Sequence, residues 1–488
     1  MPASPADLGK LIQGKMEWSD FTNSVQETLK DRDWYDEKLV QAAEEPKKLF
    51  DEIGERLGSR KEINNVLPSL LFMRRHYLRQ RNSVIPSSDS TNITEKAPKS
   101  VKGGRERLLG LMYRYMRLLD SMCTQDAEGS GIAPRDVLSD RMRDMEYKPE
   151  LPRHTVFIDH IAESVVVIMQ GTSSAYDVIK DLVADTKLVL NDKGYSHKGM
   201  ADGAELMLEE VMPQVVRALQ AYPSYGFTAV GHSLGAGVAI MMALTLRNMD
   251  THWDEKLPEG TIKNMQVIAF APPPLWAPLS ELTDDDIRGI HILANNVDMI
   301  PRATLRSMEL LVSTVKHIDE ALEGYNPMHL FQTLCNTCYD TEVDDKDAEK
   351  CEDEGNGQEN DEECMKVSER IDRIVAEAVQ EVNENADKEH AEGNSGWLHR
   401  QLYHPCPVLH MYPVLSEDME DGKQFTHGRT AEVPRSYRLH EIEPREFAKL
   451  PTFEGDGFVN DHLTEPIMQA LLRLDNGKTV ELKSHAVQ

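Results

Sequence analysis

The chain has few cysteines, no long apolar run and too little positive charge to balance its acids. Six cysteines among 488 residues, irregularly spaced, do not make a disulfide framework. The first residues, 1–7, lack the basic and apolar regions of a signal peptide. No stretch approaches the roughly 18 apolar residues that cross a bilayer. We therefore expect a cytoplasmic protein without transmembrane helices, with at most peripheral contact with a membrane or a lipid droplet.

The shortage of positive charge limits the partners. Against 83 Asp and Glu the chain has 54 Lys and Arg, which gives a formal net charge of −29. Nucleic-acid binders need basic surface, so a nucleic-acid partner is excluded. Electrostatic docking to anionic lipid is disfavoured for the same reason. If the partner is a lipid, a neutral or zwitterionic one fits this charge.

Metal ligation has little support in the sequence. Cys335 and Cys338 have the spacing of half a zinc site, but Cys351 and Cys364 lack the close spacing of a second pair. The run 353–357 misplaces the oxygen ligands of an EF-hand loop. We expect no metal and no cofactor.

The most informative stretch is Gly231-His232-Ser233-Leu234-Gly235, which reads Gly-x-Ser-x-Gly. An apolar run suited to a buried strand, 227–230, precedes it, and a small-residue, apolar helix pattern, 236–244, follows it. Strand, sharp turn and helix are the context of a nucleophile elbow. The five residues alone are also a common chance match, so the prediction rests on the flanking elements. Ser233 is the candidate nucleophile.

A serine hydroxyl needs a histidine base and an acid that orients the histidine, and in α/β-hydrolases both follow the serine. Residues 289–294 read as a buried strand, and Asp298 lies just past its carboxyl end. That end faces the same rim of the sheet as the elbow. Asp298 is therefore the candidate acid; the alternative is a turn-forming Asx residue. Asp284, Asp285 and Asp286 precede the strand, at its other end.

Four downstream histidines compete for the role of base: His410, His427, His440 and His462. His462 lies on a loop before a final helix, whose apolar residues Ile467, Ala470, Leu471 and Leu474 share one face. A histidine between the last strand and the last helix can reach back over the sheet. His410 lies within a strand pattern, where a structural histidine is the better interpretation. We therefore predict His462 as the base.

Two donors for the oxyanion are expected, one beside the nucleophile and one upstream. The first is the backbone N–H of Leu234. The second is Thr172, in the loop that follows the predicted strand 164–169, through its N–H and its hydroxyl. An ordinary strand-end turn is the alternative for Thr172.

These motifs together resemble the class 3 lipases, and among them the branch of sn-1 diacylglycerol lipases. The resemblance covers about 152–474 with one long interruption, and it rests on five segments in order: 168–172 with Asp177 and Asp181, 195–200, the elbow 231–235, 295–302, and the pair Asp461-His462. Gln170 replaces the arginine usual in the family, and the chain lacks the transmembrane helices of the full-length membrane enzymes.

The resemblance implies an α/β-hydrolase fold, with a central, mostly parallel sheet flanked by helices. It implies a serine hydrolase that cleaves a fatty-acyl ester of a glyceride through an acyl-enzyme, with diacylglycerol as the first candidate. A phospholipase A1 or a monoacylglycerol lipase remains an alternative. So does a lipase-like scaffold that binds a partner without catalysis.

Three regions are expected along the chain. Residues 1–103 form an N-terminal helical region, 104–334 and 397–488 the catalytic domain, and 335–396 an acidic, largely disordered insertion. The expected N-terminal helices and the apolar helix near 108–122 either cover one face of the sheet, which we favour, or form a membrane-facing cap.

The insertion concentrates the negative charge. Residues 340–396 hold 21 Asp and Glu against 6 Lys and Arg. Within them, 367–382 shows the spacing of an amphipathic helix. The insertion occupies the interval in which the family keeps a regulatory insertion, and we expect it either to cover the site or to be a passive loop.

Overall fold

The computed structural model describes the chain in separate stretches. They are 104–124, 132–142, 151–171, 186–249, 252–253, 255–322, 401–413, 437–450 and 460–474, with single helical residues between 69 and 76 and between 369 and 384. Outside them lie Thr172, Asp177, Asp181, His427, the paired cysteines 335–338, and nearly all of the expected N-terminal region and of the acidic run.

The chain divides into two compact units. The larger one comprises Pro86–Met308, Gly393–Val414 and Pro434–Gln488, and it holds both sheets and every described candidate site residue. The other holds α10 (Leu305–Ala321) from residue 309 onward and the helical residues between 369 and 384. Val375 and Val379 are buried there, whereas Arg373 and Glu377 are exposed.

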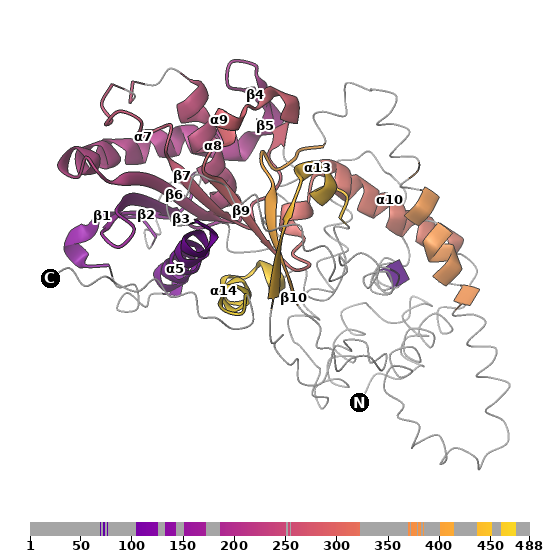
Figure 1. Cartoon of the computed structure of the whole chain (residues 1–488). Coiled ribbons are helices and arrows are strands. Elements are labelled where there is room, and N and C mark those ends of the chain that lie inside the picture. Colours follow the sequence, from indigo (N-terminus) through magenta and orange to yellow (C-terminus); the bar gives the residue numbers. More distant parts are fainter. Residues whose placement is uncertain are drawn as a thin grey trace, which may run out of the picture. The chain divides into compact units, whose positions relative to one another are not determined.

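The larger unit is built on an eight-stranded sheet with the order β1-β2-β3-β6-β7-β9-β10-β11 (Figure 1). Strands β3, β6, β7, β9 and β10 run parallel, and β1, β2 and β11 join the edges antiparallel. The strands are β1 (Val137–Asp140), β2 (His154–Asp159), β3 (Ser164–Met169), β6 (Gly226–His232), β7 (Gln266–Phe270), β9 (Ile290–Asn295), β10 (Val408–Pro413) and β11 (Tyr437–Ile442). A mostly parallel sheet with helices against it is the α/β-hydrolase architecture that the sequence predicts.

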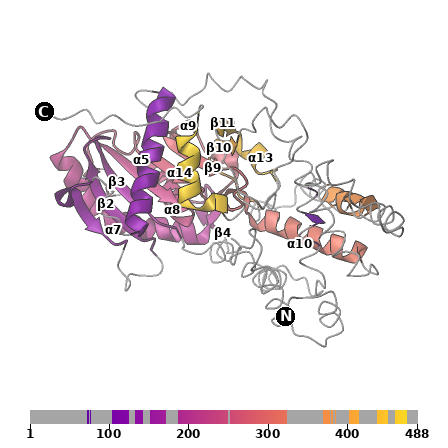
Figure 2. The same ribbon diagram turned by 90° about the horizontal axis from the view of Figure 1, so that it is seen from below.

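Helices cover both faces of this sheet. On one face lie α7 (Lys198–Ala221) and α8 (Leu234–Asn248), and on the other α5 (Gly104–Thr124) and α14 (Thr464–Leu472), side by side (Figure 2). Burial on both faces explains why every residue of β3 and β9 is buried, and why β3 is an apolar run after its first residue rather than an alternating pattern. Short helices α9 (Asp284–Ile287) and α13 (Pro444–Phe447) precede β9 and follow β11.

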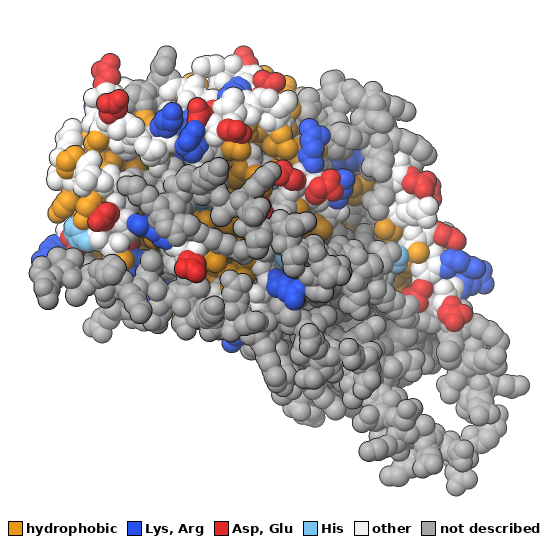
Figure 3. All heavy atoms as spheres, viewed as in Figure 1, with side chains coloured by type: hydrophobic (Ala, Val, Ile, Leu, Met, Phe, Trp, Pro, Cys, Tyr) orange, Lys and Arg blue, Asp and Glu red, His pale blue; other side chains and the backbone are white. Residues whose placement is uncertain are grey.

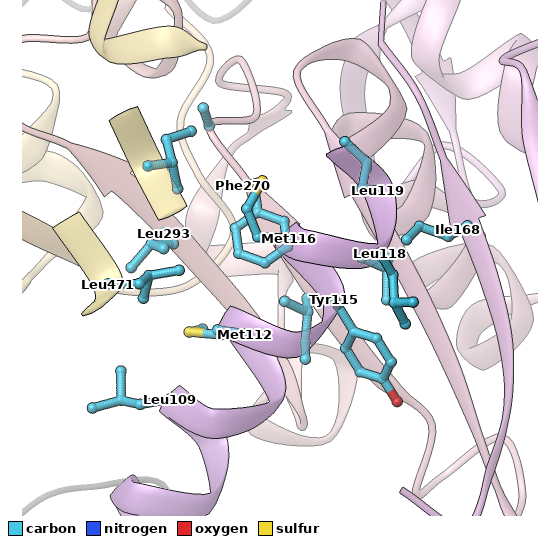
Figure 4. Close-up of a cluster of buried hydrophobic side chains, with 14 of the residues drawn as sticks. Leu109, Met112, Tyr115, Met116, Leu118, Leu119, Ile168, Phe270, Leu293 and Leu471 are labelled. Carbon is cyan, nitrogen blue, oxygen red and sulfur yellow. The ribbon is translucent and has the colours of Figure 1, made fainter. Parts of the chain in front are cut away.

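Helix α5 packs against one face of the eight-stranded sheet. Its apolar side chains point to strand residues Ile168, Phe270 and Leu293, and Leu471 of α14 joins them (Figure 4). The fully buried residues of α5 include Met112, Tyr115, Met116, Leu118 and Leu119. The sequence left open whether this helix packs on the sheet or forms a membrane-facing cap. The structure supports packing on the sheet.

A second, three-stranded sheet was not anticipated from the sequence. It consists of β4 (Thr186–Val189), β5 (Gly194–His197) and β8 (Trp276–Ala277) in the order β4-β5-β8. Strand β5 leads directly into α7, whose N-cap is His197. Met200 in the first turn of α7 packs so closely on Gly237 of α8 that a side chain at 237 would overlap it. This contact fixes α7 against α8.

Among the described helices, none is long and apolar enough to cross a membrane. On the face drawn in Figure 3, acidic and basic side chains are intermingled over the described surface.

Candidate active site

Ser233 lies at the sharp turn between the end of β6 and the start of α8. Its backbone has φ 57° and ψ −130°, a left-handed conformation that a side-chain-bearing residue rarely adopts. The turn is possible because glycines flank it: a Cβ on Gly231 would overlap the backbone of Gly235, and a Cβ on Gly235 would lie 2.8 Å from the carbonyl oxygen of Gln170. The local structure is that of the predicted elbow.

His462 is within hydrogen-bond distance of the serine. Its Nε2 lies 2.9 Å from Ser233 Oγ, although the two residues are 229 positions apart. The histidine ends a short 3-10 turn, Asn460–His462, immediately before α14. Its side chain is buried. Since Nδ1 faces a carboxylate, Nε2 is the nitrogen that can accept the serine proton.

Asp298 completes the arrangement on the far side of the imidazole. Its Oδ2 lies 2.9 Å and its Oδ1 3.1 Å from His462 Nδ1. The carboxylate is almost fully buried, and Oδ1 also accepts the backbone N–H of Ile300 at 3.0 Å. The N–H donor at 300 keeps the carboxylate turned toward the histidine. The geometry thus fixes an Nδ1–H tautomer of His462, as a general base beside a serine requires.

The structure describes one of the two expected oxyanion donors, Leu234, and not the other, Thr172. Leu234 is the first residue of α8, and the N–H groups of a first helical turn have no partner within the helix. Gly171 lies against this position: a Cβ on it would be 3.2 Å from the Leu234 nitrogen and 2.6 Å from Ser233 Cβ. The loop after β3 therefore begins beside the nucleophile, but Thr172 itself lies outside the described residues.

Two other buried histidines, His410 and His404, contact the loop that carries the acid rather than the serine. His410 on β10 lies with Nε2 2.6 Å from the Asn296 carbonyl, and His404 with Nε2 2.7 Å from the Pro301 carbonyl. Both carbonyls belong to the loop that carries Asp298. Burial lowers the pKa of His404 to about 4, so the ring is neutral and Nε2 donates. His440 on β11 is the register partner of His410.

Several hydrogen bonds that the sequence did not predict join the His462 turn to its neighbours. His232 Nε2 lies 2.7 Å from the His462 carbonyl, and Asn295 Nδ2 lies 3.1 Å from the Asp461 carbonyl. The Asp461 carboxylate accepts Asn296 Nδ2 at 2.8 Å. These partners are 165 or more positions apart in sequence, and no local pattern links them. The motifs that contain them were the only available signal.

A metal site has no support in the described part of the chain. No group of three or more His, Cys, Asp and Glu residues gathers there in a way that could hold an ion. The described cysteine, Cys406, is buried, and burial raises the pKa of its thiol to about 12. It is therefore an unreactive core side chain.

Comparison with known families finds a match for one segment of the chain. Residues 166–308, which include Ser233 and Asp298, match the family model described as lipase (class 3). This segment of the chain is similar to the class 3 lipases. This family consists of carboxylic ester hydrolases, in agreement with the resemblance seen in the sequence motifs.

Curated proteins that are similar to this chain include diacylglycerol lipases. Mouse diacylglycerol lipase-beta is 32% identical over 189 residues, which cover 37% of this chain and 25% of that protein. Rat diacylglycerol lipase-alpha is 35% identical over 104 residues, or 19% of this chain and 10% of that protein. The chain therefore matches a quarter or less of the length of these relatives.

Among solved structures, the triacylglyceride lipase of Rhizomucor miehei is similar to part of this chain with a TM-score of 0.32 and 19% sequence identity. The match covers 40% of this chain and 74% of that one. The α/β-hydrolase architecture of the larger unit rests on its own strand order and on the helices that cover both faces of the sheet.

Proposed function

We propose that this chain is a serine hydrolase that cleaves a fatty-acyl ester of a glyceride, with Ser233, His462 and Asp298 as its catalytic triad. The observation that carries the proposal is the hydrogen-bond chain from Ser233 Oγ through the imidazole to the buried carboxylate, 2.9 Å at each link. It joins three residues from three separate segments in the orientation that nucleophilic catalysis needs.

In the proposed mechanism, His462 Nε2 takes the proton of Ser233 Oγ as the oxygen attacks the ester carbonyl. Asp298 holds the imidazole in the Nδ1–H tautomer and stabilises the imidazolium that forms. The oxyanion accepts a hydrogen bond from the backbone N–H of Leu234, at the positive end of α8, and a second one from Thr172. Collapse of the intermediate releases the alcohol, which takes the proton from His462. Water, activated by the same histidine, then releases the fatty acid.

Diacylglycerol is the substrate we propose first, because the curated relatives are diacylglycerol lipases. A neutral glyceride also fits the net charge of −29, which disfavours binding to anionic lipid surfaces. The same triad could serve a monoacylglycerol lipase or a phospholipase A1. Purified protein offered di-, tri- and monoglycerides and phosphatidylcholine separates these activities by the product released.

The nucleophile is tested by Ser233→Ala. Loss of the triad serine typically lowers kcat by about 10⁶-fold, and we expect a loss of that order on a short-chain p-nitrophenyl ester. Labelling by a fluorophosphonate probe should also vanish, while circular dichroism and the melting temperature stay near those of the wild type. A wild-type protein that neither labels nor hydrolyses any ester would instead favour a non-catalytic, lipase-like scaffold.

A further inference from the structure

The elbow contributes a second histidine to the site, beside the nucleophile. His232 is buried, and its Nε2 lies 2.7 Å from the backbone carbonyl of His462. The centroids of the two rings are 4.7 Å apart. Burial, reinforced by the nearby His462, lowers the pKa of His232 to about 3. The ring is therefore neutral at any working pH, and Nε2 donates its hydrogen to the His462 carbonyl.

The acid loop contributes a matching donor. Asn295 ends β9, three residues before Asp298, and its Nδ2 donates to the Asp461 carbonyl at 3.1 Å. The side chain is 1% exposed. Its Oδ1 has no hydrogen-bond partner among the described residues. A buried amide with an unpaired oxygen lowers stability, so packing alone gives no reason for an asparagine here.

The two donors meet the same short turn at consecutive carbonyls. One comes from the strand that carries the nucleophile, and the other from the strand that leads to the acid. The turn between them, Asn460–His462, is only three residues long and carries the base. A rotation of this turn would move Nε2 away from Ser233 and Nδ1 away from Asp298 together.

We propose that His232 and Asn295 are positioning residues, which hold the His462 turn in register with the nucleophile and the acid. The inference rests on the proposed function, because it assigns these residues to the same triad. Neither side chain donates a hydrogen bond to a reacting atom; each donates to a main-chain carbonyl of the turn. A displacement of about 1 Å at a catalytic group can lower the rate about a hundredfold. A small shift of the turn after loss of either hydrogen bond would therefore lower the rate measurably.

The first test compares two substitutions of His232. His232→Gln keeps an N–H donor at the ε position, whereas His232→Met has similar bulk and no donor. We expect His232→Met to lower kcat on a p-nitrophenyl ester about tenfold to a hundredfold with KM within about twofold of the wild type. We expect His232→Gln to recover most of that loss. Equal kcat in both variants would overturn the role of the donor.

The second test separates positioning from stability. Asn295→Leu removes both the donor and the unpaired oxygen at nearly constant volume. The gain from losing the unpaired oxygen offsets the loss of the hydrogen bond to the Asp461 carbonyl, so the melting temperature should change little while kcat falls about tenfold or more. His291→Met is the matched control: it changes a buried, hydrogen-bonded histidine at the other end of β9. Its kcat should stay near that of the wild type. A stable Asn295→Leu variant with wild-type kcat would overturn the proposal.

Failure of this inference and failure of the proposed function give different results. The rate of labelling by a fluorophosphonate probe reads out the nucleophile directly. If wild type labels, Ser233→Ala does not, and both His232→Met and Asn295→Leu label at the wild-type rate, then the triad stands and the positioning role is wrong. If the wild type does not label at all, the proposed function fails first.

Discussion

At the scale of single residues, the site depends on backbone conformations that only close packing can maintain. Ser233 is held at φ 57°, and such strain costs about 1–3 kcal/mol at a residue with a side chain. The strain is maintained because Gly231, Gly235 and Gly171 let strand, helix and loop meet around the serine. Packing elsewhere in the fold thus offsets the strain at Ser233, and the strained turn places Oγ beside His462.

The elbow glycine gives a direct prediction. Gly231→Ala would place a Cβ into the backbone of Gly235 and Ala236, and neither can move without displacing α8. We expect loss of probe labelling together with a clear fall in melting temperature. Gly226→Ala, at the other end of the same strand, is the control, because its Cβ would meet nothing closer than Ser164 Oγ at 3.8 Å. Equal activity of the two variants would contradict this account of the turn.

The acid gives a second prediction at the same scale. In Asp298→Asn the side-chain oxygen can still accept the N–H of Ile300, but the amide nitrogen then faces His462 and favours the Nε2–H tautomer. That tautomer cannot accept the proton of Ser233, so kcat should fall by about 10⁴-fold with little change in melting temperature.

The control for this substitution is Asp284→Asn, an exposed carboxylate before β9 that should leave kcat unchanged. A fully active Asp298→Asn would assign the acid elsewhere.

At the scale of elements, the parts that could be predicted are those with a local pattern. The run 227–244 contains its own strand, turn and helix, and Asp298 follows directly on an apolar strand. His462 could be proposed because an amphipathic helix begins just after it. The small sheet β4-β5-β8 was missed because its strands are two to four residues long, and two residues are too few to show a period. The hydrogen bonds of His232 and Asn295 could not be predicted because their partners are distant in sequence.

Helix α5 offers a prediction about packing. Met116 is fully buried on the face that α5 turns to the sheet. Met116→Ala should remove contacts with strands and leave a cavity, which typically costs about 2–5 kcal/mol.

Urea unfolding followed by circular dichroism measures this loss. Arg117→Ala, on the exposed face one residue further along α5, should change the free energy of unfolding by less than about 0.5 kcal/mol. Equal effects at 116 and 117 would mean that α5 does not cover the sheet.

At the scale of the whole molecule, several histidines are buried as neutral rings. Burial lowers the pKa of His291 and of His404 to about 4, and that of His232 to about 3. In the unfolded chain each titrates near pH 6.5. Between about pH 6.5 and 4 the unfolded chain therefore binds more protons than the folded one, and the free energy of unfolding falls as the pH falls.

This linkage gives the last prediction. Each of these histidines should contribute up to about 1.4 kcal/mol of lost stability per pH unit within that window. His291→Gln keeps a donor toward Gln266 and removes one titrating group, so its free energy of unfolding should depend less steeply on pH than that of the wild type. Urea unfolding at half-unit steps from pH 7 to pH 4 measures both slopes. Identical slopes would mean that His291 is not held neutral in the fold, because only a group that binds protons differently in the two states can change the slope.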